Sequence, residues 1–84
     1  MAKRSRHTII SQILGICKGG ASKTRIVYQA NLNFRTVNPY LDLLIKNNLI
    51  EREQGDKILY KTTEKGEDLR EGFELIDSQL TELI

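Results

Sequence analysis

Three neighbouring side chains could read the edges of nucleic-acid bases. Arg35, Thr36 and Asn38 lie within one short run of the sequence. A guanidinium can bond O6 and N7 of guanine, and a carboxamide can bond N6 and N7 of adenine. If duplex DNA is the ligand, these residues belong in its major groove. For any one of them alone, an ordinary solvated side chain is the simpler interpretation, so the argument depends on how the fold groups them.

Other cations are suited to a phosphate backbone. Lys23 and Arg25 lie near the start of an expected helix, where free backbone amides also attract phosphate. Arg52 and Lys57 flank the tip of an expected hairpin, from which they would reach the backbone or the minor groove. A basic N-terminal arm would add contacts that weaken steeply with salt but do not depend on sequence. Its cations are Lys3, Arg4 and Arg6.

Catalysis and metal binding are poorly supported by the residue types present. His7 is the one histidine and Cys17 the one cysteine, so the chain offers no nucleophile–base pair built on them. We interpret Cys17 as a small apolar core residue. No Cys/His cluster has the spacing of a zinc site, and Gly19-Gly20 lacks that of a phosphate-binding loop. The sequence therefore predicts a protein that is not an enzyme and has no metal, cofactor or evident small-molecule ligand.

Charge is distributed unevenly along the chain. Residues 1–65 hold twelve of the thirteen Lys and Arg residues but five of the eleven acidic ones, whereas residues 66–84 hold one Arg and six acids. This predicts a basic head whose cations converge on a single face, and an acidic segment with another role. The 84 residues suffice for one domain. Because there is no secretory or membrane-length apolar run, we expect a soluble, cytoplasmic protein.

Hydrophobic spacing predicts three helices that position these residues. Apolar side chains at helical spacing predict a first helix over about residues 5–17, which Gly19-Gly20 ends. Ser22 is expected to cap a short second helix, and Asn33 a third. The apolar stripe of the third helix consists of Phe34, Val37, Leu41, Leu44 and Ile45. Its opposite side carries the three residues that could read bases.

Pro39 conflicts with a third helix that begins at Asn33, because a proline in the second turn removes a backbone hydrogen bond and clashes with the preceding turn. Either the helix is kinked there, or it begins later with Thr36 as its cap. We favour the kinked helix, because the apolar stripe needs both ends of the segment.

Residues 51–66, EREQGDKILYKTTEKG, predict a charged β-hairpin that leads directly into a last helix. Gly55-Asp56 predicts a two-residue turn in which the glycine takes a positive φ. Thr63 is expected to cap a helix that begins at Glu64. Together the elements predict a mainly α fold with a small β-hairpin (α+β), that is, a helix-turn-helix with an appended β-ribbon.

The last helix carries a heptad seam of apolar residues. The seam consists of Leu69, Phe73, Ile76, Leu80 and Leu83. A helix of about 20 residues spans roughly 30 Å, which is longer than so small a core can cover. Part of the seam should therefore project and pair with a second chain; the alternative is that the helix folds back on the first one. We expect residues 1–63 to form the binding head and residues 64–84 the dimerisation helix of one continuous domain.

Three segments carry a resemblance to a known family: RSRHTIISQIL, TRIVYQANLNFRTVNPYLDLLI and YKTTEKG. They resemble the small archaeal winged-helix DNA-binding proteins of the 10a chromatin type and related predicted archaeal transcriptional regulators. The resemblance runs from Arg4 to about Leu80. It implies a winged helix-turn-helix with a long C-terminal coiled-coil helix, and an antiparallel homodimer with one DNA-binding head at each end. In such a pair Arg70 would approach Asp77 of the second chain.

Function follows from that resemblance as an expectation. It implies that the protein binds double-stranded DNA, sequence-specifically or generally, as a nucleoid-associated transcriptional regulator or chromatin protein. The charged hairpin would be the wing. The alternative is a winged helix that serves as a protein–protein interaction module in a larger complex. That alternative predicts an exposed apolar patch on the outer side of the third helix, where the sequence places mainly polar residues.

Overall fold

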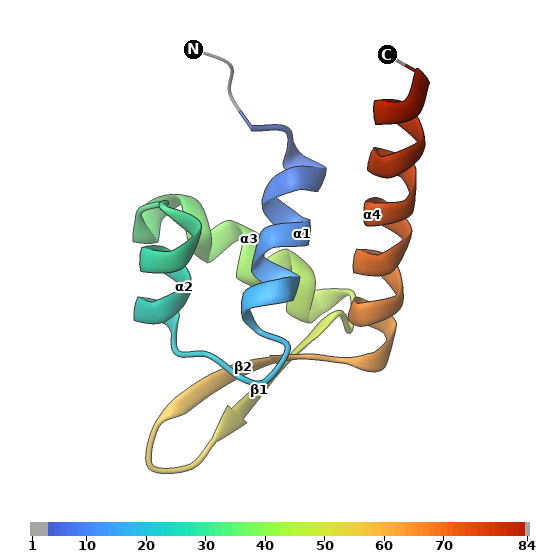
Figure 1. The fold of residues 1–84 in the computed structure, drawn as a ribbon. Helices are drawn as coiled ribbons and strands as arrows, with labels where there is room; N and C mark the ends of the chain where they lie inside the picture. Colours follow the sequence, from blue (N-terminus) through green and yellow to red (C-terminus); the bar gives the residue numbers. More distant parts are fainter. Residues whose placement is uncertain (1–3, 84) are drawn as a thin grey trace.

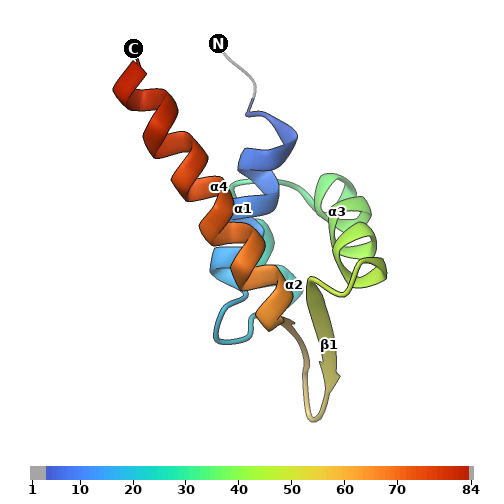
Figure 2. The same cartoon turned by 90° about the vertical axis from the view of Figure 1, so that its right-hand side faces the viewer.

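The computed structural model describes residues 4–83, and side chains for residues 4–81. Its elements are, in chain order, α1 (Arg6–Ile16), α2 (Lys23–Ala30), α3 (Phe34–Lys46), β1 (Ile50–Gln54), β2 (Ile58–Thr62) and α4 (Glu64–Leu83). Figure 1 shows α1, α2 and α3 grouped above the hairpin, with α4 running beside α1. In Figure 2, α3 and α4 lie on opposite sides of α1. The predicted α+β class and order of elements are confirmed.

The predicted caps set the boundaries of α2 and α3. Ser22 Oγ accepts a hydrogen bond from the Arg25 amide at 3.2 Å, and Asn33 Oδ1 accepts one from the Thr36 amide at 2.8 Å. Asn31 closes α2 in the left-handed region, with φ of 54°, a conformation that asparagine tolerates better than most residues. Because Asn33 caps α3, the helix does not begin at Thr36. It continues through Pro39 as one element, which confirms the favoured start of the helix; the kink at Pro39 stays a prediction.

One core joins the three helices to the base of the hairpin. The buried residues come from α1, α2, α3, both strands and the α1–α2 loop: Ile9, Ile13, Leu14, Cys17, Ala21, Ile26, Val37, Leu41, Leu44, Ile50 and Tyr60. Phe34 departs from its predicted stripe, since 47% of the residue is exposed at the first position of α3. It therefore adds little to the core.

Cys17 is fully buried in the core, as interpreted from the sequence. Its burial raises the pKa of the thiol to about 12. The thiol is therefore protonated at neutral pH, and a thiolate nucleophile is not available there.

The hairpin pairs Arg52 with Tyr60 and Glu51 with Lys61. Its second strand also pairs with the α1–α2 loop: the Ala21 amide donates to Tyr60 O at 2.9 Å, and the Tyr60 amide donates to Ala21 O at 2.8 Å. The turn prediction is wrong in detail. Three residues, 55–57, separate the strands, and among the glycines of the described chain only Gly20 has a positive φ. A three-residue connection lets Gly55 keep an ordinary φ.

The last helix begins as predicted, with Thr63 Oγ1 accepting a hydrogen bond from the Gly66 amide at 3.0 Å. Gly66 passes so close to the loop before β1 that an added Cβ would lie 2.2 Å from Leu49 O. Further along, Leu69 packs against the core, and the ring of Phe73 lies 5.7 Å from that of His7 on α1. Within residues 4–83, no helix is both long enough and apolar enough to span a membrane.

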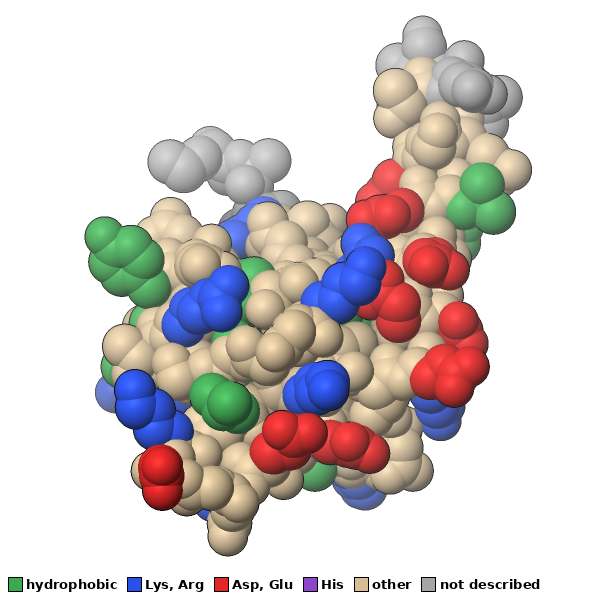
Figure 3. All heavy atoms as spheres, turned by 60° about the horizontal axis from the view of Figure 1, so that its bottom comes forward, with side chains coloured by type: hydrophobic (Ala, Val, Ile, Leu, Met, Phe, Trp, Pro, Cys, Tyr) green, Lys and Arg blue, Asp and Glu red, His purple; other side chains and the backbone are tan. Residues whose placement is uncertain are grey.

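α4 folds back along one half and projects along the other, and its pairing with a second chain stays a prediction. Its first half folds back against α1, as Leu69 and Phe73 show. Its second half extends past the head, with Ile76 54% and Leu80 52% exposed. The molecule consequently measures 47 × 30 × 19 Å along its principal axes, and the projecting end of α4 stands out at the upper right of Figure 3.

Candidate functional site

The outer side of α3 presents polar and cationic side chains to solvent. Arg35, Asn38 and Lys46 are exposed and Thr36 is partly exposed. Among the described residues, no acid forms an ion pair with Arg35 or Lys46. Asp42 is exposed on the same side and lowers the net positive charge of its C-terminal half. The helix therefore presents two cations and an amide without committing them to partners in the described chain.

An apolar strip runs beside those polar residues. Thr36, Pro39, Tyr40 and Leu43 recur every three or four residues, and they line a shallow groove of about 360 Å³ together with Arg6 of α1. Pro39 is exposed and Leu43 is 47% exposed. The sequence analysis missed this strip, although the spacing of positions 36, 39, 40 and 43 on one helical face could have revealed it. The strip also supplies part of what a protein-binding winged helix would require.

The hairpin and the start of α2 bring two predicted residues together. Directly paired residues share a face of a hairpin, so Arg52 lies on the same face as Tyr60. Lys23 Nζ lies 5.9 Å from the centroid of the Tyr60 ring, within the usual range of a cation–π contact. Lys57 is exposed at the tip. Lys61 lies on the other face, directly opposite Glu51.

Arg4 forms hydrogen bonds with other residues of the same chain. Its guanidinium donates hydrogen bonds to Ala30 O at 2.6 Å, to Asn31 O at 3.2 Å and to Gln12 Oε1 at 2.8 Å. It thereby satisfies carbonyl groups that the end of α2 leaves without helical partners. Of the two described cations of the predicted N-terminal arm, Arg6 lies beside α3. Lys3 lies outside the described residues.

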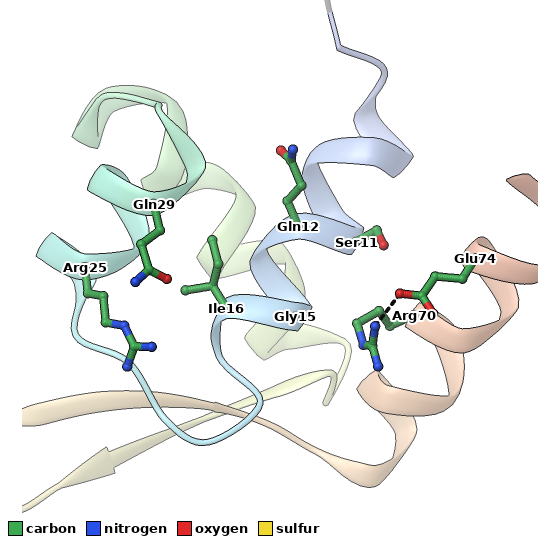
Figure 4. Close-up of a pocket in the computed structure, with 8 residues that line it drawn as sticks. All are labelled: Ser11, Gln12, Gly15, Ile16, Arg25, Gln29, Arg70 and Glu74. Carbon is green, nitrogen blue, oxygen red and sulfur yellow. Dashed lines mark hydrogen bonds and ion pairs between the residues drawn. The ribbon is translucent and has the colours of Figure 1, made fainter.

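Arg25 lies away from the outer side of α3. Figure 4 shows it at the edge of a groove of about 500 Å³ between α1, α2 and α4, with α3 behind α1. The α1 side chains of this groove, Ser11 and Gln12, lie opposite the stripe that α1 buries. Arg25 therefore does not join Arg35 on one surface.

Arg70 faces the same groove but is bound to two acids of its own helix. It forms ion pairs with Glu67 and with Glu74, the latter at 2.5 Å. The hydrogen bonds from Arg70 hold the pKa of Glu67 below its usual value, and Lys18 at 3.7 Å acts in the same direction. The Asp77 carboxylate lies 3.6 Å from His7 Nε2. Both members of the expected Arg70–Asp77 contact between chains therefore have partners within their own chain.

The prediction of a single basic face is wrong. Figure 3 shows acidic side chains gathered beside the projecting helix, and Lys and Arg side chains spread over the rest of that view with acids among them. Arg4, Lys18 and Arg70 are held by groups of the protein itself, and Arg25 and Lys61 lie on other surfaces. The candidate site is consequently smaller than the sequence suggested. Its described members are the α3 residues Arg35, Thr36 and Asn38, with Arg6, Lys23, Arg52 and Lys57.

The heptad seam on α4 is also divided, between residues that contact the head and residues that are exposed. Leu69 and Phe73 contact the protein's own head, whereas Ile76 and Leu80 are exposed. Leu75, off the seam, is 62% exposed. The side chain of Leu83 lies outside the described residues. The described part of the chain contains no cluster of His, Cys, Asp or Glu able to hold a metal ion.

Comparison with known proteins identifies the family to which this fold belongs. A winged helix-turn-helix family profile matches residues 3–80. Sso10a-2, a DNA-binding protein from Sulfolobus solfataricus, has a similar structure, with a TM-score of 0.80 and 32% identity over 95% of this chain and 88% of that one. BpsR from Bordetella bronchiseptica gives a TM-score of 0.75 over 96% of this chain and 60% of that one. At 21% identity, that likeness shows the fold alone.

Two sequence relatives come from Methanocaldococcus jannaschii, and both are uncharacterised proteins. The first is 40% identical over 82 residues, which are 92% of this chain and 81% of that protein. The second is 38% identical over 73 residues; the match covers 86% of this chain but 33% of that protein, which is much longer.

The hairpin after α3 is thus a wing, and the fold is a winged helix. The chain belongs to the winged helix-turn-helix family and, within it, to the small archaeal winged-helix proteins. The predicted family is therefore confirmed.

Proposed function

We propose that the protein binds duplex DNA through the outer side of α3, with the hairpin and the start of α2 on the flanking phosphates. The observation that carries this proposal is the exposure of Arg35 and Asn38 on α3, where no described acid pairs with the guanidinium. A guanidinium and a carboxamide on a helix that fits the major groove are suited to base edges. Sso10a-2, a structural relative at 32% identity, is a DNA-binding protein, which supports the proposal.

Each flanking cation has a proposed role. Lys23 Nζ lies over the Tyr60 ring, and Arg52 is paired with Tyr60 across the hairpin, so both would contact one stretch of backbone. Lys57 at the wing tip and Arg6 beside α3 extend the charged surface at its two edges. Arg25, and Lys3 outside the described residues, would add only peripheral, sequence-independent contacts. Arg4 contributes indirectly, by holding the end of α2.

The cellular role is that of a transcriptional regulator or chromatin protein on the nucleoid. In this proposal residues 1–63 form the DNA-binding head and residues 64–84 join two chains. The first turns of α4 also belong to the head physically, because Leu69 packs against the core.

A fluorescence titration over a series of salt concentrations tests DNA binding, using one mixed-sequence duplex and one pool of random duplexes. The logarithm of the affinity should fall linearly with the logarithm of salt concentration. Arg35→Ala should weaken binding in a sequence-dependent way, whereas Lys57→Ala should weaken binding to all duplexes alike and reduce the salt slope by about one. If Arg35→Ala leaves the affinity for every duplex unchanged, α3 is not the reading helix.

Lys61→Ala is the matched control for the wing. It removes the same charge from the same hairpin, but from the face opposite Arg52. Arg52→Ala should therefore weaken DNA binding and Lys61→Ala should leave it almost unchanged. Equal losses from the two variants would mean that the wing acts only through its net charge.

We further propose that two chains pair through the projecting half of α4. The exposure of Ile76 and Leu80 supports this, because apolar residues at heptad spacing are buried when a second helix packs on them. Since Leu69 and Phe73 already contact their own head, the pairing surface is shorter than the sequence predicted. Sedimentation should give a dimer for the wild type and a monomer for Ile76→Lys. Ser78→Lys, which places the same charge on the other side of α4, should remain dimeric; a monomeric wild type would refute the pairing.

A protein-binding role is the second candidate, and the apolar strip of Pro39, Tyr40 and Leu43 beside Arg35 favours it. The same titration separates the two functions. A winged helix that acts only on proteins should bind neither duplex at low salt.

A further inference from the structure

The apolar strip on α3 is a surface that phosphate contacts and hydrogen-bonding base contacts do not explain. Leu43 is 47% exposed and Pro39 is exposed, and both line the groove beside Arg6. Pro39 has no backbone N–H and neither side chain can form a hydrogen bond. On a helix surface expected to lie in a polar groove, such residues need an apolar partner to offset their exposure.

Charge around the strip indicates what kind of partner that is. Arg6 forms one edge of the groove. Arg35 precedes Pro39 by four residues and Lys46 follows Leu43 by three, so both are neighbours of the strip on the helix surface. Among the described residues, no acid pairs with Arg35 or Lys46. Asp42, three residues after Pro39, also borders the strip, but the three cations give the border a net positive charge. A small apolar surface with such a border is complementary to a polyanion that carries isolated apolar groups.

The size of the strip argues against a protein partner as its main occupant. A stable protein interface buries roughly 800 Å² on each side and involves about 20–30 residues. The strip consists of two exposed apolar side chains, a half-buried tyrosine and a threonine, in a groove of about 360 Å³. It is large enough for one or two methyl groups.

Duplex DNA carries such groups in its major groove, as the C5-methyl of each thymine. Pro39 and Leu43 are one turn apart, which places them about 6 Å apart along the helix axis. Successive bases on a strand are about 3.4 Å apart. The two side chains therefore match methyl groups roughly two base steps apart.

We propose that Pro39 and Leu43 contact thymine methyl groups, so that this protein prefers duplexes with thymine in the contacted segment. The inference rests on the proposed function, because it requires α3 to lie in the major groove. It adds to that function a preference which the hydrogen-bonding residues do not supply. The methyl groups pack on the strip while Arg6, Arg35 and Lys46 remain available to phosphates and bases.

Replacing thymine by deoxyuridine tests this directly, since it removes the methyl group and keeps the base pairing and the phosphates. Two duplexes of one A·T-rich sequence, with thymine or with uracil throughout, are titrated by fluorescence anisotropy under identical salt. Burial of one methyl group should favour the thymine duplex roughly fourfold, and burial of two up to about fifteenfold. This first measurement uses the wild-type protein, so it does not depend on how any variant folds.

Leu43→Ser then assigns the effect to the strip. It should lower the ratio of the two affinities towards one. Leu75→Ser is the matched control, because Leu75 is an exposed leucine on α4, and it should keep the wild-type ratio. Circular dichroism checks that both variants retain their helices.

The possible failures can be told apart. Equal affinities of the wild type for the two duplexes would overturn the methyl contacts and leave DNA binding intact. A thymine preference that survives in Leu43→Ser would place the methyl contacts elsewhere and would also overturn the inference. Binding to neither duplex would overturn the proposed function itself, and the methyl contacts with it.

Discussion

Gly66 and Gly72 lie in the same helix, yet the structure predicts opposite results when each is replaced by alanine. A Cβ on Gly66 would lie 2.2 Å from Leu49 O and 2.8 Å from Thr62 Cγ2, whereas a Cβ on Gly72 would meet nothing within 4 Å. Real Cβ atoms almost never approach other heavy atoms closer than 3.0 Å. Gly66→Ala must therefore displace the loop before β1, and Gly72→Ala need displace nothing.

The magnitude follows from three opposing contributions. Alanine is a better helix former than glycine by about 1 kcal/mol, which stabilises both variants. Overpacking a filled site costs about 1–3 kcal/mol. Leu49 O also accepts a hydrogen bond from the Thr63 amide at 3.0 Å, so moving that carbonyl weakens a bond that contributes about 1 kcal/mol. The free energy of unfolding should fall by about 1–3 kcal/mol in Gly66→Ala and rise by about 1 kcal/mol in Gly72→Ala.

Urea unfolding followed by far-UV circular dichroism measures both values. The variants and the wild type should be compared at one protein concentration, because the stability of an associating protein depends on concentration. A Gly66→Ala variant as stable as Gly72→Ala would refute the reasoning. It would mean that the loop around Leu49 moves aside without cost.

Three further predictions concern single residues. Asn33→Ala removes the cap that accepts the Thr36 amide at 2.8 Å, and urea unfolding should show a loss of about 1 kcal/mol; an unchanged midpoint would show that water replaces the cap. Because burial raises the pKa of Cys17 from 9.0 to about 12, the folded state favours the protonated thiol, so stability should decline as pH rises above about 9. A Cys17→Ala variant should lack that decline, although it is less stable overall, and wild-type Cys17 should react with a thiol reagent only on unfolding. Because Arg70 lowers the pKa of Glu67, the stability from this pair should be present above the ordinary glutamate pKa of 4.5 and be lost as pH falls below it. Glu67→Gln should flatten that acid-side decline in thermal melts, and an identical pH profile would contradict the assigned pair.

The fold could be predicted because its signals are local. The caps at Ser22, Asn33 and Thr63 each depend on a side chain and a backbone amide three residues away, and all three form. The spacing of apolar residues likewise fixes which side of α3 is buried, since helical geometry alone relates position to face. Phe34 fails because the first residue of a helix lies at the edge of the core, which spacing does not reveal.

The candidate site was predicted less well because the sequence shows which side chains are charged but not which groups they contact in the fold. Arg4 is separated from Ala30 by 26 residues, and only the packing of α1 against α2 brings its guanidinium to that carbonyl. Lys18, in the loop after α1, meets Glu67 of α4 in the same way. The division of the α4 seam has a similar origin, since the heptad spacing shows which side is apolar but not which half of it the head already covers.

The attachment of the wing limits how the protein can adapt to a surface. Four hydrogen bonds fasten the base of β2 to the end of α1 and the loop that follows. Two join Ala21 and Tyr60, one runs from the Thr62 amide to Cys17 O at 3.0 Å, and one runs from Thr62 Oγ1 to Leu14 O at 2.5 Å. The hairpin therefore cannot swing as an arm without breaking them. Any bending towards a bound molecule must come from the tip, residues 53–59, while the root stays fixed to the end of α1 and the loop that follows it.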